Sequence, residues 1–235
     1  MQLHIGGYIP TSFLDYPGNT AAVVFFAGCQ FRGPFCHNPE LVLPGAAKER
    51  IGAEHILADL KKRAPFLDGI CVTGGEPTLQ PGLLPFLREI RSLGFKVKLD
   101  TNGARPDVLE RILAEKLADY AAMDLKAPEE TYSLACGRDG DATLLPLVRK
   151  SIALLLRGAV PFEFRTTLVP GLHSIEDASL LGRMAQGAPL FVLQNFRPGN
   201  TLDPGFSSLS SFPMEFLEEF RTALLPFVGE VKIRA

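Results

Sequence analysis

Short apolar runs alternate with segments of helical spacing along most of this chain. The apolar runs predict buried strands at residues 21–28, 69–73, 96–99, 120–126, 161–169 and 190–194. Apolar positions that recur every three or four residues predict helices at residues 53–63, 83–93, 106–113, 144–156, 175–186 and 214–227. Because neighbouring parallel strands need a crossover helix between them, this alternation predicts a parallel α/β architecture.

The strand–helix unit repeats about six times, which predicts an open, partial (β/α)6 TIM-like barrel rather than a closed eight-stranded one. No shift in composition marks a second domain, so we expect a single domain over residues 1–235. Gly and Pro turns mark residues 1–20 as an N-terminal flap, and another turn is expected at Pro44–Gly45. Residues 21–200 form the β/α core, and residues 201–235 add a last helix and an edge strand at 231–233.

The composition excludes several classes of protein. With 46% hydrophobic and 21% charged residues, the chain is globular and can bury a large core. A formal net charge of −2 gives no general attraction to nucleic acid or to anionic membranes. No apolar run reaches the roughly 18 residues of a membrane span, and the start is not a basic segment followed by an apolar one. We therefore expect a cytoplasmic protein that binds neither nucleic acid nor membrane.

Polar residues follow each predicted strand at its carboxyl end, where parallel β/α folds collect their active sites. Taken singly, they have ordinary explanations, such as a turn at Gly74–Pro77, a turn or helix cap at Asp100–Gly103, and solvated charges at Lys126 and Arg165. Their occurrence at successive strand ends instead predicts one polar mouth. The candidates are Gly74, Gly75, Glu76, Pro77, Asp100, Thr101, Asn102, Asp124, Lys126, Arg165 and Thr167, with Gln194, Asn195 and Arg197 after the last strand.

Two of the four cysteines, Cys29 and Cys36, lie on the loop after the first strand. Soft cysteine sulfurs hold iron well, so the pair is a candidate metal or cluster site; the alternative is two ordinary buried cysteines of a cytosolic protein. His37 either holds this loop through a hydrogen bond or binds metal. Cys71 lies within a predicted strand and Cys136 on a distant connection, so the sequence places neither beside the pair.

The loop resembles the C-x3-C-x2-C cluster loop of the radical S-adenosylmethionine (radical SAM) superfamily, with Gly33 in the place of the middle cysteine. Further motifs extend the resemblance over nearly the whole chain to the glycyl-radical-enzyme activases of that superfamily. Within them, the chain is most similar to the activating proteins of anaerobic ribonucleoside-triphosphate reductase. The motifs are Ile5–Gly7, Ser12–Gly18, Cys36–Leu41, Gly74–Pro77, Asp100–Gly103 and Met123–Lys126.

The resemblance implies a 4Fe-4S cluster on Cys29 and Cys36 and a site for S-adenosylmethionine (SAM). In the family, the turn that matches Gly74–Pro77 lies against the methionine part of SAM, and Glu76 can accept a hydrogen bond from its ammonium group. In some activases the acidic members of the site also hold a monovalent cation. The other residues that the resemblance assigns to the SAM pocket are Asp100, Thr101, Asn102, Asp124, Lys126 and Arg165, the last for the carboxylate or the ribose.

The implied reaction is reductive cleavage of SAM at the cluster, followed by removal of a hydrogen atom from a glycine of a partner glycyl radical enzyme. A reducing protein such as flavodoxin or ferredoxin would supply the electron. Three thiolates leave one iron of a cubane open, whereas two leave two irons open. With Gly33 we therefore expect a weakly held cluster and little SAM cleavage, both restored by Gly33→Cys. The alternatives are a degenerate, non-catalytic SAM- or partner-binding protein, and a radical SAM enzyme that acts on a small molecule.

Overall fold

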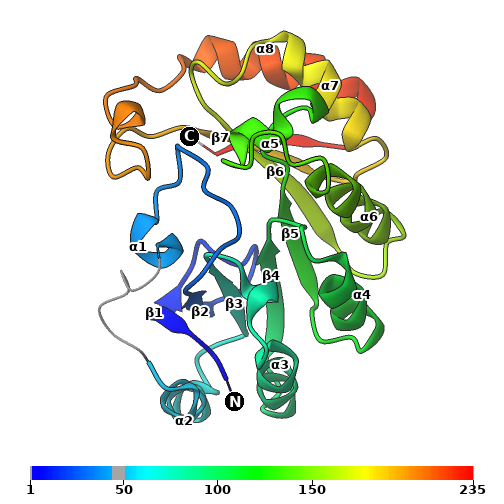
Figure 1. The fold of residues 1–235 in the computed structure, drawn as a ribbon. Helices are drawn as coiled ribbons and strands as arrows, with labels where there is room; N and C mark the ends of the chain where they lie inside the picture. The colour runs from blue at the N-terminus through cyan, green and yellow to red at the C-terminus, as the bar shows by residue number, and fades with distance from the viewer. Residues whose placement is uncertain (1, 44–50, 235) are drawn as a thin grey trace.

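Within residues 2–43 and 51–234, which the computed structural model describes, one open sheet holds eight strands (Figure 1). β1 is antiparallel to β2, and every later pair of neighbours is parallel. The strands lie in chain order across the sheet, so the edges are β1 and β8 and the barrel is partial, as the sequence predicts. The strands are β1 (Ile5–Ser12), β2 (Ala21–Phe26), β3 (Gly69–Gly74), β4 (Lys96–Thr101), β5 (Tyr120–Asp124), β6 (Phe162–Leu168), β7 (Phe191–Asn195) and β8 (Val231–Arg234).

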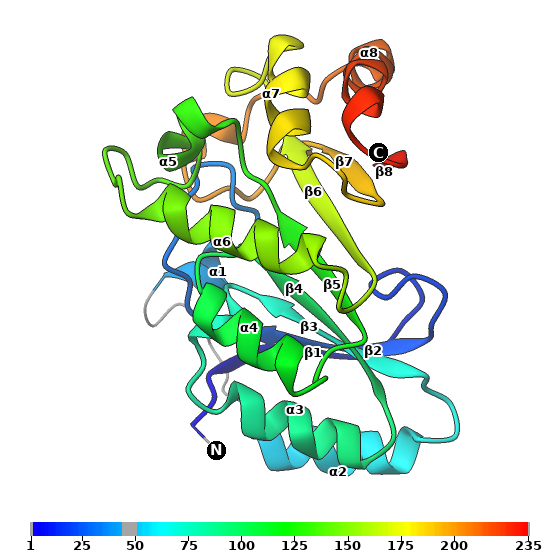
Figure 2. The ribbon, with the colours of Figure 1, turned by 90° about the vertical axis from the view of Figure 1, so that its right-hand side faces the viewer.

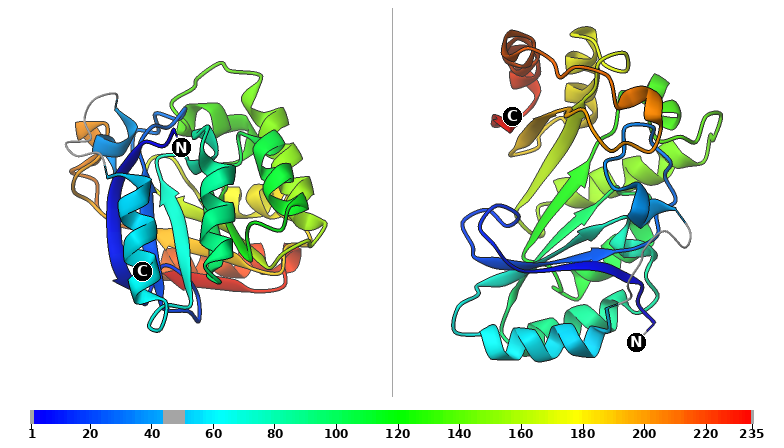
Figure 3. Two further views of the ribbon diagram at one scale, coloured as in Figure 1. Left: turned by 90° about the horizontal axis from the view of Figure 1, so that it is seen from below. Right: turned by 90° about the vertical axis from the view of Figure 1, so that its left-hand side faces the viewer.

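Crossover helices cover the outer face of the sheet. Figure 2 shows α4 and α6 side by side in front of the strands, and the view from below in Figure 3 shows the sheet curving inside the helices. No described helix is long and apolar enough to cross a membrane. The helices are α1 (Pro39–Val42), α2 (Ala53–Arg63), α3 (Leu83–Ser92), α4 (Pro106–Ala114), α5 (Tyr132–Ala135), α6 (Leu144–Leu156), α7 (Glu176–Met184) and α8 (Met214–Leu224).

The core lies between the sheet and these helices. On α2 the buried side chains Ile56 and Leu60 recur at helical spacing, and on α3 Leu83, Leu87 and Ile90 do the same. Strands β2 to β7 are buried along most of their length, as expected for parallel strands between other layers, whereas the edge strands β1 and β8 are not. This packing fixes the carboxyl ends of β2 to β6 at one edge of the sheet, where the polar candidates lie.

The predicted strands and crossover helices are confirmed, and α2 and α6 have the predicted bounds. Two helices were not predicted, α1 and α5, because four residues are too few to show a helical period. Ile5–Ser12, within the predicted flap, pairs with β2 as an edge strand. The turn predicted at Pro44–Gly45 lies outside the described residues.

Candidate active site

A cavity of about 230 Å³ opens at the carboxyl ends of the strands. It joins the cysteine loop after β2, the turn after β3 and the ends of β4, β5 and β6. Pro77 does not line it, because this residue begins a short 3-10 helix (Pro77–Leu79) behind the turn. The predicted residues that do line it are Cys29, Cys36, Gly74, Gly75, Glu76, Asp100, Thr101, Asn102, Asp124, Lys126, Arg165 and Thr167.

Cys29 lies just after β2 with polar donors around its sulfur. Sγ accepts from the Phe31 N–H, with the nitrogen at 3.4 Å, and from the Asn102 side-chain amide, with Nδ2 at 3.6 Å. Burial raises the pKa of Cys29 to about 11, and Glu76 adds to the rise. The free side chain is therefore a thiol at neutral pH. With a metal bound in place of the proton, the same two donors would stabilise the thiolate and tune its electron donation.

The Gly74–Gly75 turn is packed against the backbone at the end of β2. The Gly75 N–H donates to the Phe26 carbonyl oxygen at 2.7 Å, and the Glu76 N–H donates to that of Gly28 at 2.8 Å. A Cβ at residue 74 would lie 2.4 Å from the Phe26 nitrogen, and one at residue 75 would lie 2.3 Å from the Gly28 oxygen. Only glycine fits here, and the turn is thereby held against the start of the cysteine loop.

Glu76 is fully buried, and its carboxylate connects the turn to the end of β4. Oε1 accepts from the Thr78 N–H at 3.1 Å and from the Thr101 hydroxyl at 2.7 Å. Oε2 accepts from the Asn102 N–H at 2.7 Å. Burial raises the pKa of Glu76, and these hydrogen bonds oppose the rise. Oε2 keeps room for one further donor, because each carboxylate oxygen has two lone pairs.

Charged side chains of β4, β5 and β6 pair with one another along the cavity. Asp100 pairs with Lys98 and, at 3.1 Å, with Nη1 of Arg165. Asp124 pairs with Nε of Arg165 at 2.9 Å and with Nζ of Lys126 at 2.8 Å. We call these five residues the charge ladder. The ladder itself holds three cations against two carboxylates, and two of the cations, Arg165 and Lys126, line the cavity, where they can attract an anionic group.

The ladder keeps both of its carboxylates ionised. Burial would raise the pKa of Asp124, but Arg165 and Lys126 outweigh it and hold that pKa well below its usual range. The pKa of Asp100 is lowered in the same way by Arg165 and Lys98, against the effect of burial. A monovalent cation at these carboxylates stays a prediction, and it would compete with three basic side chains.

His37 holds the cysteine loop through a hydrogen bond, the first of the two roles considered for it. Its Nε2 lies 2.6 Å from the Arg197 carbonyl oxygen, and its ring stacks on Phe196 with the centroids 5.3 Å apart. The polar residues at the end of β7 and just after it do not line the main cavity. Gln194, Asn195 and Arg197 line a neighbouring hollow together with His37 and Thr167, so the single polar mouth predicted for all strand ends is divided in two.

Two features of the site were not predicted from sequence, the position of Cys136 and the pairing of Lys98 with Asp100. Cys136 lines the cavity with Cys29 and Cys36, so its predicted distance from them is wrong; α5 brings it back onto the cysteine loop. Cys71 stays buried within β3 as predicted, with its sulfur 3.7 Å from Nζ of Lys98. Lys98 could have been found, because strand alternation places it on the same face as Asp100.

Comparison with known proteins identifies the family. The model of the radical SAM superfamily matches residues 23–174 of this chain. The chain belongs to the radical SAM superfamily. Over its full length it is 32% identical to a Methanocaldococcus jannaschii protein named for activating a glycyl-radical enzyme, and the match covers 97% of that protein.

Two further radical SAM relatives match more distantly or over a shorter range. The pyruvate formate-lyase-activating enzyme of Clostridium pasteurianum is 34% identical over 131 residues, which is 53% of each chain. The crystal structure of a radical SAM methyltransferase from Sphaerobacter thermophilus superposes with a TM-score of 0.69 at 18% identity, covering 95% of this chain and 68% of that one. At that identity the second match supports the radical SAM fold alone.

The cavity residues fit the two groups that radical SAM enzymes use, a 4Fe-4S cluster and SAM. Thiols are the ligands that iron–sulfur clusters take, and Cys29 and Cys36 line the cavity. The excess positive charge of the charge ladder suits the carboxylate of an amino acid. SAM carries such a carboxylate on its methionine part, so both groups find matching chemistry among residues of one cavity.

Proposed function

We propose that this protein is a glycyl-radical activating enzyme whose partner is an anaerobic ribonucleotide reductase. One observation carries the proposal: cysteine thiols, the Gly74–Glu76 turn and the charge ladder line one cavity at the strand ends. The full-length relative and the shorter one are both named for activating enzymes, which supports the activase class. The choice of ribonucleotide reductase rests on the motifs of residues 5–126.

In this proposal Cys29 and Cys36 hold the cluster, and the cavity beside them holds SAM. The bound cluster supplies one electron, received from a reducing protein such as flavodoxin or ferredoxin, for the reductive cleavage of SAM. The chain's own residues bind SAM and orient it. Arg165 and Lys126 attract the SAM carboxylate, and the free lone pair at Oε2 of Glu76 accepts from its ammonium group.

The turn and the loop set the geometry around these groups. Gly74 and Gly75 carry no side chain that could fill the space beside Cys29. The Asn102 amide donates to the Cys29 sulfur and also accepts at Oδ1 from the Gln30 side chain at 3.1 Å, so its orientation is fixed. Preorganised groups of this kind keep the reacting atoms in place without rearrangement.

The number and positions of the cysteines favour a macromolecular substrate over a small molecule. The sequence has four cysteines; three line the cavity and Cys71 is buried in β3. Four cysteines are too few to ligate a second iron–sulfur cluster that could bind and activate a small molecule. A macromolecular partner that presents its own glycine at the cavity would need no second cluster. We place the protein in the cytoplasm, where such a partner would act.

The test is electron paramagnetic resonance of the partner. Cluster-loaded protein, SAM and a one-electron reductant are mixed anaerobically with an anaerobic ribonucleotide reductase. We expect the signal of a glycyl radical on the reductase. The matched control is a reductase whose radical-forming glycine is replaced by alanine, which should show no such signal. Release of methionine without any radical on the reductase would contradict the choice of partner.

A further inference from the structure

A third cysteine lines the cavity beside the cysteine loop. Cys136, at the end of α5, lines the same cavity as Cys29, Cys36 and Gly33. We propose that Cys136 supplies the third thiolate of the cluster in place of the side chain that is absent at Gly33. This inference rests on the proposed function, because it concerns the cluster of that same site.

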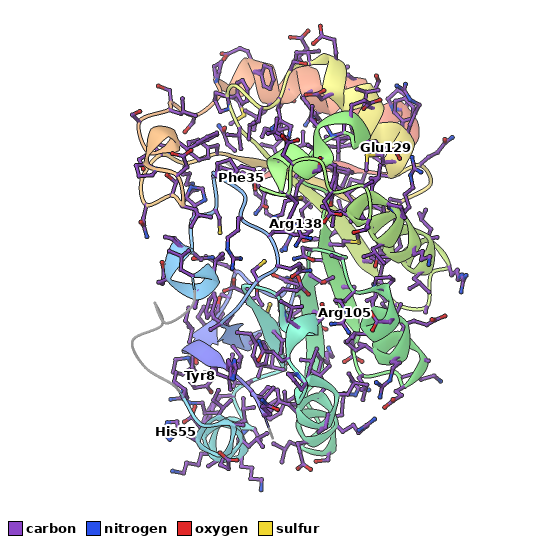
Figure 4. The ribbon with its side chains drawn as sticks, in the orientation of Figure 1. Tyr8, Phe35, His55, Arg105, Glu129 and Arg138 are labelled. Atoms are coloured by element: carbon purple, nitrogen blue, oxygen red, sulfur yellow. The ribbon has the colours of Figure 1, made fainter. Side chains whose placement is uncertain are left out.

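The end of α5 is docked on the cysteine loop by its backbone. The Arg32 N–H donates to the Cys136 carbonyl oxygen at 2.8 Å. The Arg138 guanidinium donates to the Gln30 carbonyl oxygen, with Nη1 at 3.2 Å. Figure 4 labels Phe35 on the cysteine loop and Arg138 just after α5, and Phe35 packs in one buried cluster with Ala135 of α5. Cys136 is therefore held against the loop by one hydrogen bond at its own carbonyl and one at Arg138, two residues later.

Two glycines make this close approach possible. Gly137 has a φ of +62°, and a Cβ there would lie 2.1 Å from the Arg32 carbonyl oxygen. On the loop itself, a Cβ at residue 33 would lie 2.9 Å from the carbonyl oxygen of Ala135. A side chain at residue 33 would therefore require the α5 backbone to shift slightly away from the loop. The lack of a side chain at residue 33 and the close approach of Cys136 therefore belong to the same contact between the loop and α5.

The arrangement suits a cluster rather than a single metal ion. Among the described residues, no three His, Cys, Asp or Glu side chains converge closely enough to hold one ion. The thiolates of a cubane bind different irons, so they surround a space instead of meeting at a point. Cys29, Cys36 and Cys136 line such a space, Cys136 with only 1% of its surface exposed, whereas Cys71, equally buried, lies within β3 and does not line it. Three thiolates also leave one iron open for SAM.

The test is the iron and sulfide content of the full chain after anaerobic reconstitution, with the absorption spectrum and the paramagnetic resonance of the reduced protein. We expect about four irons per wild-type chain. Cys136→Ser should lose most of the iron, sulfide and cluster absorption, whereas the matched control Cys71→Ser should keep them. Circular dichroism confirms that each variant is folded. The double variant Gly33→Cys/Cys136→Ala returns a thiol to the loop, and with a small shift of the Ala135 carbonyl away from the new Cβ it should regain the cluster lost in Cys136→Ala.

Three results would overturn the inference. The first is a full cluster in folded Cys136→Ser, and the second is a cluster that forms only when Gly33→Cys is present. The third is a cluster lost equally in the Cys71 and Cys136 variants. If Cys136→Ser does not fold, the rescue by the double variant decides. Failure of the proposed function looks different, because a cluster that needs Cys136 but never cleaves SAM would leave this inference standing and remove the enzyme activity.

Discussion

At the scale of single residues, the site depends on side chains that have more than one partner. Glu76 accepts hydrogen bonds from both the turn after β3 and the end of β4. Asn102 donates to the Cys29 sulfur while its backbone N–H donates to Glu76. A substitution at either residue should therefore also disturb the groups that it bonds on neighbouring elements.

Glu76→Gln should destabilise the fold and weaken SAM binding. The amide of glutamine has one acceptor oxygen, so it leaves a buried donor of Thr101 or Asn102 without its partner. An unsatisfied buried group costs about 1–3 kcal/mol, measured as the free energy of unfolding in urea. The control is Glu89→Gln on the exposed side of α3, which should change stability by less than about 0.5 kcal/mol. Equal effects in the two variants would refute the connecting role of Glu76.

Asn102→Ala should make the reduction potential of the cluster more negative. Removing a hydrogen-bond donor from the Cys29 sulfur leaves more electron density on the thiolate, which disfavours reduction of the metal. A potentiometric titration followed by paramagnetic resonance measures the shift. Asn19→Ala, at the opposite end of β2, is the control and should leave the potential unchanged. A potential equal to that of the wild type in Asn102→Ala would rule out this influence on the cluster.

At the scale of elements, two connections assemble the site: the glycine turn against β2, and the charge ladder across β4, β5 and β6. The turn depends on backbone contact, since Cβ atoms at residues 74 and 75 have no room. The ladder depends on charge, since Arg165 bridges Asp100 on β4 and Asp124 at the end of β5. Each connection can be broken by one substitution.

Gly75→Ala should push the turn away from the cysteine loop. The new Cβ would meet the Gly28 carbonyl oxygen at 2.3 Å, and a backbone atom cannot move aside as a flexible side chain can. We expect a loss of about 1–3 kcal/mol in the free energy of unfolding, together with weaker SAM binding. At Gly205 the nearest atom to an added Cβ is the Asp203 side chain at 3.2 Å, so Gly205→Ala serves as a mild control. Wild-type stability in Gly75→Ala would show that the contact is not tight.

Asp124→Asn should destabilise the protein in a pH-dependent way. It leaves Arg165 and Lys126 without the carboxylate between them, at a cost of about 1–3 kcal/mol near neutral pH. The folded-state pKa of Asp124 is lowered, so its stabilisation is present above the unfolded value of about 3.9 and is lost as the pH falls below it.

Urea unfolding of Asp124→Asn and wild type at several pH values measures this difference. The gap between the two proteins should hold from about pH 5 to about pH 8 and shrink below about pH 4. Asp107→Asn removes an exposed pair with Arg105 and should cost less than about 1 kcal/mol. A gap between wild type and Asp124→Asn that widens on acidification would contradict the assigned role of the carboxylate.

The elements of the fold could be predicted from sequence, whereas contacts between distant segments could not. Periodicity was sufficient for α2 and α6 because each is long and amphipathic. The four residues of α5 carry no such signal, so the return of Cys136 to the cysteine loop was missed. Their positions at strand ends correctly predicted that Asp100, Asp124 and Arg165 share one site. The sequence did not predict that Arg165 pairs with both carboxylates.

At the scale of the whole molecule, the open sheet brings these connections to one cavity. Parallel strands β2 to β6 place their carboxyl ends at one edge, where the cysteine loop and the end of α5, docked on each other, also line the cavity. The net result is a site built from segments spread over residues 29–167. We propose that this site cleaves SAM reductively in the chain as it stands, because Cys136 would replace the thiolate whose absence at Gly33 led us to expect little activity from the loop alone.

Release of methionine from SAM tests that claim most directly. Wild-type protein, reconstituted anaerobically and carrying a full cluster, is mixed with SAM and a one-electron reductant, and methionine is quantified over time. We predict that methionine forms in the wild-type protein only when the reductant is present. A full cluster with bound SAM and no methionine would contradict the account, because the site would then hold both groups without the chemistry that we assign to it.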